Sequence, residues 1–205
     1  MLLAEMVIRL PPWVAALTAA LPERLPRQED RLRLAIELAR QNVAAGSGGP
    51  FGAAVFDEAG QPLAVGVNLV VPSRCSILHA EMVALALAQQ RVGHFDLSLG
   101  GQRHLELCAS TEPCAMCFGA IPWSGISRLV CGARSEDAQA VGFDEGPKLP
   151  DWVAALAERG IEVERDVLRA EAVAVLQEYA AAGGTLYNGG VEPGTTRPRG
   201  AVAVP

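Results

Sequence analysis

Apolar positions recur along the first third of the chain with two different periods, and each period predicts one kind of element. From residue 28 to 45 they fall three and four apart, as on one face of a helix. The runs 51–57 and 62–71 instead have the composition of strands and are joined by four residues that include Gly60. The pattern predicts a long helix followed by a β-hairpin.

The middle of the chain alternates between strand-like and helix-like runs. A helix is predicted from about Leu78, a strand over 104–110, a second helix from about Cys114 and a strand over 127–131. This alternation, with its apolar centre, is typical of an α/β protein whose sheet is covered by helices on both faces.

The last third of the chain has weaker periodicity. Residues 136–149 predict a functional loop with a turn of helix at most. A helix over 152–158, a short strand over 161–165 and a closing helix over 170–182 follow. Residues 189–205 contain Gly, Pro, Thr and Arg without periodicity, which predicts a mobile tail.

Length and composition indicate one domain with extensions. A chain of 205 residues that is 50% hydrophobic can bury a sizeable core. We assign residues 27–188 to this domain and residues 1–26 to an N-terminal extension that contains a short helix over 12–21. Residues 189–205 form the tail.

Charge and cysteine content narrow the classes of function. With a formal net charge of −6, the chain has no excess of positive charge that would attract a polyanion, so a nucleic acid is disfavoured as partner. Five cysteines are an odd number, which fits a reducing compartment better than a disulfide framework. Glu5 stands where a secretion signal would be positively charged, and no apolar run reaches the roughly 18 residues of a membrane span. We therefore expect a cytoplasmic protein that does not cross a membrane.

Three side chains in the centre of the chain have the chemistry of zinc ligands. His79 offers an imidazole, and Cys114 and Cys117 offer two thiols three residues apart at the predicted start of a helix. The amide dipoles at a helix start lower the pKa of a thiol. No fourth ligand stands at the spacing of a closed structural site, so the pattern predicts a catalytic zinc with one position left for water.

Glu81 is placed to move the protons that such a water must exchange. It can take a proton from the water, so that hydroxide attacks a substrate, and can then give the proton back. The backbone N–H of Ala80 has no partner within a helix that begins here, and it can hold a developing oxyanion. These residues predict a zinc-dependent hydrolysis.

The complete pattern is H-x-E followed by P-C-x-x-C. It consists of His79-Ala80-Glu81 and Pro113-Cys114-Ala115-Met116-Cys117. With this pattern the chain resembles the zinc-dependent nucleobase deaminases. The resemblance implies a cytidine deaminase-like fold, a three-layer α/β/α sandwich with a central mixed sheet of about five strands. It also implies one Zn²⁺ per subunit.

Further features resemble the bacterial guanine deaminases of that superfamily. Phe51 stands at the start of a strand and Asn68 on the next, where the family packs a phenylalanine against the base and hydrogen-bonds its polar edge with an amide. Trp123 matches an aromatic residue that lines the base pocket. A late loop with Phe143 and Glu145 matches one whose final acid approaches the amino group being removed. The resemblance therefore implies conversion of guanine to xanthine and ammonia.

Two points of this resemblance extend the prediction. The family usually has an aspartate where this chain has Glu145, and the longer acid predicts amino-triazines such as ammeline as side substrates. The family's C-terminal segment crosses a dimer to close the partner's site, and Tyr187 resembles the aromatic residue near its end. The resemblance thus implies a homodimer with exchanged C-terminal segments and a small-molecule nucleobase as substrate.

Three other functions share part of this pattern. A tRNA adenosine deaminase has the same zinc motif, but the chain lacks a basic tail and the loop with Phe143 and Glu145 would be unexplained. A cytosine or cytidine deaminase leaves the same loop unexplained. A non-catalytic zinc scaffold has no use for Glu81 beside an open metal position. Assays on free bases and on RNA separate these functions.

Overall fold

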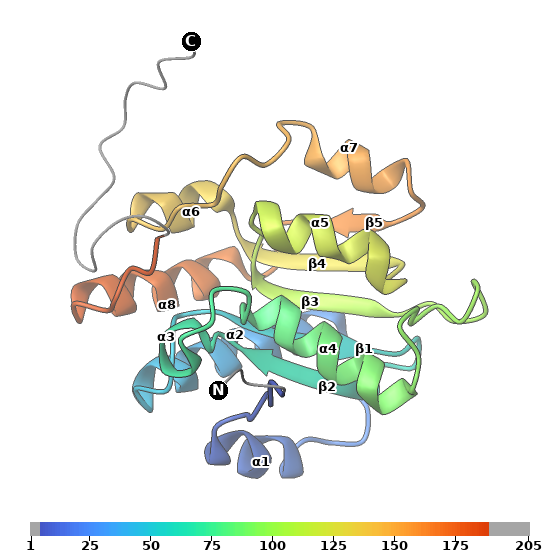
Figure 1. Cartoon of the computed structure of the whole chain (residues 1–205), viewed down its shortest axis with the longest axis horizontal. Helices are drawn as coiled ribbons and strands as arrows, with labels where there is room; N and C mark the ends of the chain where they lie inside the picture. Colours follow the sequence, from blue (N-terminus) through green and yellow to red (C-terminus); the bar gives the residue numbers. More distant parts are fainter. Residues whose placement is uncertain (1–4, 189–205) are drawn as a thin grey trace.

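The computed structural model describes residues 5–188, which form a five-stranded sheet flanked by helices (Figure 1). The strand order is β2-β1-β3-β4-β5. Strand β1 pairs antiparallel with β2 and β3, whereas β3, β4 and β5 run parallel. The strands are β1 (Gly52–Phe56), β2 (Pro62–Val67), β3 (Glu106–Thr111), β4 (Arg128–Ala133) and β5 (Glu162–Glu164). The helices are α1 (Pro12–Ala19), α2 (Gln28–Ala44), α3 (Val70–Ser73), α4 (Ala80–Val92), α5 (Ala115–Ser124), α6 (Ser135–Ala140), α7 (Trp152–Ala157) and α8 (Arg169–Ala181).

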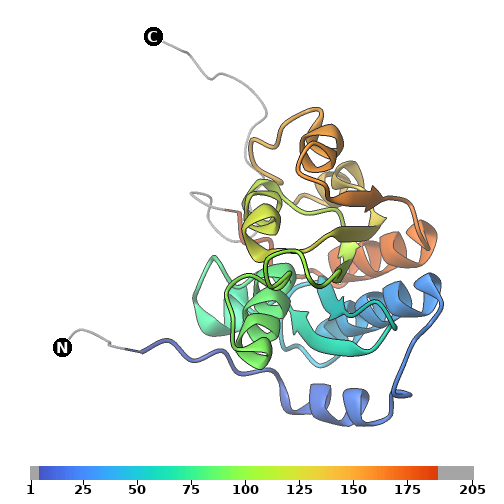
Figure 2. The same ribbon diagram turned by 90° about the vertical axis from the view of Figure 1, so that its right-hand side faces the viewer.

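Helices cover both faces of the sheet. Helices α2 and α8 pack on one face, and α4, α5 and α7 lie on the other (Figure 2). Each face has its own apolar core, because successive strand residues point to opposite sides. Phe56 of β1 joins Ile36 in the first core, and its neighbour Val55 joins Ile121 in the second. The predicted three-layer α/β/α sandwich with a mixed five-stranded sheet is confirmed.

Two glycines bring helices α2 and α4 close to the sheet. A Cβ atom at Gly52 would lie 2.2 Å from the carbonyl oxygen of Ala35 on α2. At Gly66 it would lie 2.2 Å from the carbonyl oxygen of Ala80 on α4. Because Ala80 is the first residue of α4, the close approach at Gly66 also fixes the position of the preceding residue, His79.

The second strand of the hairpin is shorter than predicted. It ends at Val67 instead of continuing to residue 71. The Asn68 Oδ1 atom accepts a hydrogen bond from the Val70 N–H at 3.3 Å, and the chain turns into α3. A side chain that bonds the backbone two residues ahead offers an alternative to the strand ladder, which the apolar composition of this run does not reveal.

The predicted loop over residues 136–149 contains more helix than expected. Helix α6 has six residues, and the Asp137 carboxylate accepts a hydrogen bond from the Arg134 N–H at 2.8 Å at its start. Arg169 of α8 donates two hydrogen bonds, each 2.8 Å long, to the same carboxylate. A cap and a long-range ion pair stabilise a helix that is too short to show periodicity.

The N-terminal extension packs against the sheet. Helix α1 lies beside the edge strand β2, with Val14 buried in the first core (Figure 2). Trp13 Nε1 donates a hydrogen bond to Ser47 Oγ at 3.0 Å. The predicted tail, residues 189–205, lies outside the described residues. Among residues 5–188, no helix combines the length and the apolar character needed to cross a membrane.

A buried ion pair ties the sheet to α2. Glu106 of β3 accepts two hydrogen bonds from Arg31, at 2.6 and 3.2 Å, and a third from Arg128 of β4. Burial alone would raise the pKa of Glu106, but the hydrogen bonds from Arg31 and Cys108 outweigh it and hold the pKa below its ordinary value. This stabilisation is therefore present at neutral pH and is lost as the pH falls through the lowered pKa of the folded state.

We expect Glu106→Gln to lower the free energy of unfolding by about 3 kcal/mol at neutral pH, because Arg31 and Arg128 lose their buried counter-charge. Urea unfolding measures this change. The matched control is Glu162→Gln, which removes an exposed partner of Arg128 at 3.4 Å and should change the free energy by less than about 1 kcal/mol. Equal effects of the two substitutions would contradict a special role for the buried pair.

Candidate active site and metal centre

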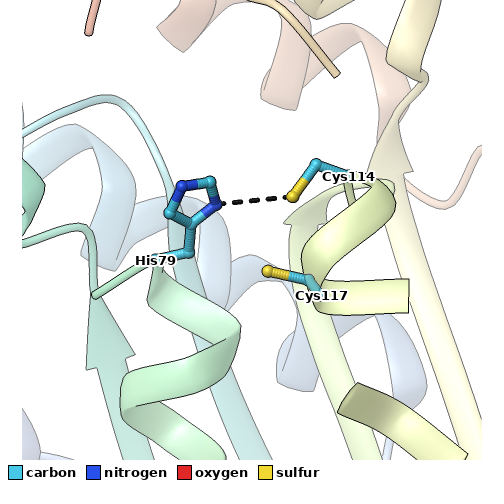
Figure 3. A group of neighbouring side chains, drawn as sticks. All are labelled: His79, Cys114 and Cys117. Atoms are coloured by element: carbon cyan, nitrogen blue, oxygen red, sulfur yellow. Dashed lines mark hydrogen bonds between the residues drawn. The ribbon is translucent and has the colours of Figure 1, made fainter. Parts of the chain in front are cut away.

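The three predicted zinc ligands lie together between two helix N-termini (Figure 3). His79 is the residue that precedes α4, and Cys114 is the residue that precedes α5. Cys117 lies in the first turn of α5, so its sulfur faces the same space as that of Cys114. Cys114 follows β3 directly after Glu112 and Pro113, so the cluster lies at the carboxyl end of that strand.

The geometry of the cluster fits a tetrahedral metal site. The His79 Nδ1 atom lies 3.5 Å from the Cys114 sulfur. Zinc bonds of ordinary length at a tetrahedral angle place such a nitrogen and sulfur about 3.6 Å apart. All three donor atoms lie within 4.8 Å of one another, and no fourth donor joins them among the described residues. The donor set therefore fits zinc with an open fourth position.

A hydrogen bond between the two thiols moves their pKa values in opposite directions. A hydrogen bond from Cys117, with further support from His79, lowers the pKa of Cys114 to about 4. The same hydrogen bond raises the pKa of Cys117 well above its ordinary value. Cys114 is therefore a thiolate at neutral pH, which is the form that binds a metal.

A cavity of about 540 Å³ opens beside this cluster. His79 and Cys114 form part of its wall, and the segment 143–147 forms another part. Ser76 and Met116, which sequence analysis did not single out as binding residues, also line it. The cavity has room for a single heterocyclic ring system beside the metal ligands.

Two buried carboxyl groups face the cavity. Burial and the nearby Cys114 thiolate raise the pKa of Glu81 to about 7. The same two causes raise the pKa of Glu145 to about 8. The Glu145 carbonyl oxygen accepts a hydrogen bond at 2.9 Å from the N–H of Ala115, the first residue of α5, which holds the loop against the metal cluster. Both carboxyl groups can thus carry protons near neutral pH.

Three aromatic rings form an apolar wall of the cavity. Phe51 and Phe143 meet edge to face with ring centroids 4.9 Å apart, and Phe143 and Tyr187 lie 5.3 Å apart. Tyr187 also lies 6.3 Å from the His79 ring. Three predicted binding residues from distant parts of the chain are therefore brought together. A planar ring packed against them would be shielded from water.

Tyr187 closes the cavity of its own chain in this structure. Asn188 anchors it: its Oδ1 atom accepts a hydrogen bond from the Asp144 N–H and its Nδ2 atom donates one to the Gly142 carbonyl, both at 2.9 Å. The Tyr187 hydroxyl is buried, and no group among residues 5–188 forms a hydrogen bond with it. A buried hydroxyl of this kind is available to a polar group of a bound ligand. The exchange of C-terminal segments between subunits stays a prediction.

Trp123 is not where the sequence comparison placed it. Its side chain is 84% exposed and lines a separate groove with Phe118 and Ile161. Trp123 lies near the end of α5, far along the helix from the ligands at its start, and does not line the cavity beside them. Its contact with a base stays a prediction.

Asn68 and Ala80 lie next to the cavity wall. Asn68 is buried, and its side-chain oxygen bonds the N–H of Val70, which lines the cavity. Ala80 begins α4, as its predicted role requires, and its N–H stands at the helix start beside His79. Direct contact of either residue with a substrate stays a prediction.

Sequence analysis missed a polar network behind Glu145. The Ser135 hydroxyl donates a hydrogen bond to Glu145 at 3.2 Å, and Lys148 donates one to Ser135 at 2.5 Å. Glu112 is buried beside them and accepts a hydrogen bond from Arg165 at 2.6 Å. These residues belong to no recognised motif. One signal was visible: Lys148 is the only lysine in the sequence.

This fold, with its His-Cys-Cys cluster beside a buried glutamate, defines a zinc-dependent deaminase. Residues 26–133 match the cytidine and deoxycytidylate deaminase zinc-binding region, and the chain belongs to this family. A structure of a guanine deaminase from Nitrosomonas europaea is 47% identical with a TM-score of 0.83, covering 88% of this chain and 99% of that chain. A structure of a variant protein in complex with 8-azaguanine is 46% identical with a TM-score of 0.83, and the match covers 89% of this chain and 99% of that chain. The guanine deaminase of Bacillus subtilis is 38% identical over 117 residues, which are 57% of this chain and 71% of the relative. The predicted resemblance to bacterial guanine deaminases is confirmed.

Proposed function

We propose that this protein hydrolyses guanine to xanthine and ammonia with one zinc ion held by His79, Cys114 and Cys117. The observation that carries the proposal is the meeting of this cluster with Glu81 and Glu145 in one cavity. The similarity to guanine deaminases and to a protein bound to 8-azaguanine supports guanine as the ring. Zinc in this cluster would act as a Lewis acid that activates water as the nucleophile.

Glu81 moves the first proton. Its carboxylate takes a proton from the attacking water and passes it to the ring nitrogen N3 of guanine, which makes the amine-bearing carbon C2 electrophilic. The water oxygen then forms a bond to C2. With a pKa of about 7, Glu81 exchanges a proton readily in both directions. The Ala80 N–H, at the start of α4, supports the negative charge that develops on oxygen.

Glu145 serves the leaving group. Its pKa of about 8 keeps it protonated at neutral pH, so it can give a proton to the exocyclic amine as the C2–N bond breaks. Ammonia leaves, and the hydroxyl group on C2 gives its proton back to the Glu145 carboxylate, so that the oxygen that came from water remains as the carbonyl group of xanthine and the acid is restored. Glu81 thus serves the attacking water, and Glu145 serves the amine that leaves C2.

Phe51, Phe143 and Tyr187 position the base. Their rings supply the apolar surface that a flat purine needs, and the Tyr187 hydroxyl offers a hydrogen bond within the cavity. Ammeline presents a similar amidine edge on a smaller ring, so it fits the same site as a side substrate. A homodimer with exchanged C-terminal segments is part of this proposal, and in it the segment that carries Tyr187 would leave the cavity of its own chain and line that of the partner subunit.

Ammonia release from a panel of substrates tests the proposed function. The panel contains guanine, guanosine, adenine, cytosine, cytidine, ammeline and a tRNA. We expect guanine to have the highest kcat/KM and guanosine to react at least about a hundredfold more slowly, because the ribose must displace the aromatic wall. Faster reaction of the tRNA or of cytidine than of guanine would contradict the proposal.

We expect Cys114→Ser to retain less than about half an equivalent of zinc, against about one equivalent in the unaltered protein. The serine hydroxyl is not deprotonated at neutral pH and is a poor zinc ligand. Metal analysis of purified protein measures the difference. Cys75→Ser, which replaces a half-buried thiol outside the cluster, is the control and should keep full occupancy. Undiminished zinc in Cys114→Ser would contradict the ligand assignment.

A further inference from the structure

The described part of the chain contains a hydrogen-bonded relay that ends on Glu145. The Lys148 ammonium group donates to the Ser135 Oγ atom at 2.5 Å, and the Ser135 hydroxyl donates to Glu145 Oε2 at 3.2 Å. Lys148 also donates to the Pro113 carbonyl oxygen at 2.9 Å. Pro113 precedes the metal-ligand candidate Cys114, so one ammonium group contacts both the segment leading to Cys114 and the serine that holds Glu145.

Lys148 is buried on the far side of the Glu145 loop from the substrate cavity. Its side chain is 10% exposed, its nitrogen lies 4.6 Å from the centre of the Trp152 ring, and Glu112 is 3.6 Å away. Trp152 and Lys148 line a neighbouring cavity, and Lys148 is absent from the lining of the substrate cavity. It therefore has no direct access to the proposed substrate.

Burying an ammonium group is costly unless its protons are bonded, so its presence here needs a reason. Of the 17 lysine and arginine residues in the chain, the other sixteen are arginines. A guanidinium is a planar fork of fixed shape, whereas an ammonium directs three protons to the corners of a tetrahedron. Pro113, Ser135 and Glu112 surround the nitrogen on three sides. This arrangement suits lysine and not arginine.

The relay fixes the direction of the serine hydroxyl. Because a lone pair of Ser135 Oγ accepts a hydrogen bond from Lys148, the single hydroxyl hydrogen is turned toward Glu145 Oε2. The Glu145 carboxyl group is then held by one oxygen, and its other oxygen, Oε1, remains for the leaving amine. Without the lysine, the hydroxyl can rotate and the carboxyl group can turn away from its working position.

We propose that Lys148 is a positioning residue for Glu145 and acts on it through the Ser135 hydroxyl. The inference rests on the proposed function, in which Glu145 gives a proton to the leaving amine. A displacement of the acid by about 1 Å costs on the order of a hundredfold in rate. Loss of the relay therefore lowers kcat and leaves KM nearly unchanged, because the rings that bind the base are not touched.

A double-mutant cycle on kcat of the zinc-loaded enzyme tests the inference. Ser135→Ala should lower kcat at least about tenfold in the unaltered protein and less than about twofold in a Glu145→Gln background, since the relay then has no acid to hold. Ser135→Thr, which keeps the hydroxyl, should restore most of kcat. Lys148→Met should behave like Ser135→Ala, and Lys148→Arg should not restore activity. Equal losses from Ser135→Ala in both backgrounds would overturn the inference.

A second measurement does not depend on turnover. Because the sequence has one lysine, protein labelled with ¹⁵N-lysine gives a single side-chain ammonium signal in an NMR spectrum. Ser135→Ala should shift this signal and speed the exchange of its protons with water, whereas Ser124→Ala should leave it unchanged. Ser124 is the matched control because its hydroxyl is also buried but donates a hydrogen bond to the Ile121 carbonyl of its own helix, at 2.6 Å, instead of joining the relay. An unshifted signal in Ser135→Ala would contradict the relay.

The cycle also separates this inference from the proposed substrate. If the unaltered enzyme releases ammonia from another ring and not from guanine, the guanine assignment fails, while the cycle on that other ring still tests the relay. If Ser135→Ala keeps full kcat on the preferred ring and Glu145→Gln does not, the proposed function stands and the positioning role of Lys148 is overturned.

Discussion

Replacement of Glu81 by glutamine is expected to lower turnover on guanine by about 10²–10⁴-fold, the usual contribution of a positioned proton carrier. Glutamine has nearly the same shape and can still form hydrogen bonds in the cavity. It cannot take a proton from the attacking water or deliver one to the ring. The loss should therefore appear in kcat, with KM for guanine changed much less.

The same variant should keep its metal and its fold. Glu81 is buried next to the ligands but is not one of the three clustered donors, so zinc content and melting temperature should stay close to those of the unaltered protein. Glu178→Gln, an equivalent change on the exposed face of α8, is the control and should leave turnover unaltered. Near-normal turnover of Glu81→Gln with a full zinc complement would mean that another group moves the proton.

The fold was predictable where periodicity extends over several turns or strands. Helix α2 begins at Gln28 as predicted and ends one residue early, and the five predicted strands are all present. The errors lie where a single side chain redirects the backbone. Asn68 ends β2 and starts α3, and Asp137 caps α6. Such local bonds leave no periodic signal, so hydrophobic pattern cannot reveal them.

The site was predictable to the extent that its residues are close in sequence. His79 with Glu81, and Cys114 with Cys117, stand at spacings set by the first turn of a helix, and the structure brings all four together. Ser135 and Lys148 were missed, because their positions relative to Glu145 depend on how α6 and the following loop fold back.

The position of Trp123 outside the cavity has a related cause. Its place after Cys117 in the sequence suggested a place in the pocket, but the helix between them carries it to the exposed end.

Glu145→Gln is expected to lower turnover on guanine at least about tenfold, and as much as about a thousandfold, while zinc stays bound. Glu145 is 6% exposed, faces the cavity, and is held by Ser135 through its side chain and by Ala115 through its carbonyl oxygen. Glutamine can keep these contacts, but it cannot protonate the departing amine. The expected loss is smaller than at Glu81, because water that reaches the cavity can partly replace the acid at the leaving group.

Glu145→Asp tests the length of the acid separately from its chemistry. Aspartate keeps the carboxyl group and shortens the side chain by one methylene, so it should retain substantial activity on guanine while the range of other rings, ammeline included, becomes narrower. The ratio of kcat/KM for guanine to that for ammeline measures this change. Glu178→Gln, on the exposed face of α8, is the control and should not change the ratio. If Glu145→Gln deaminates guanine as fast as the unaltered protein, the loop has a structural role, and deamination of RNA or of pyrimidines must be tested as the main activity.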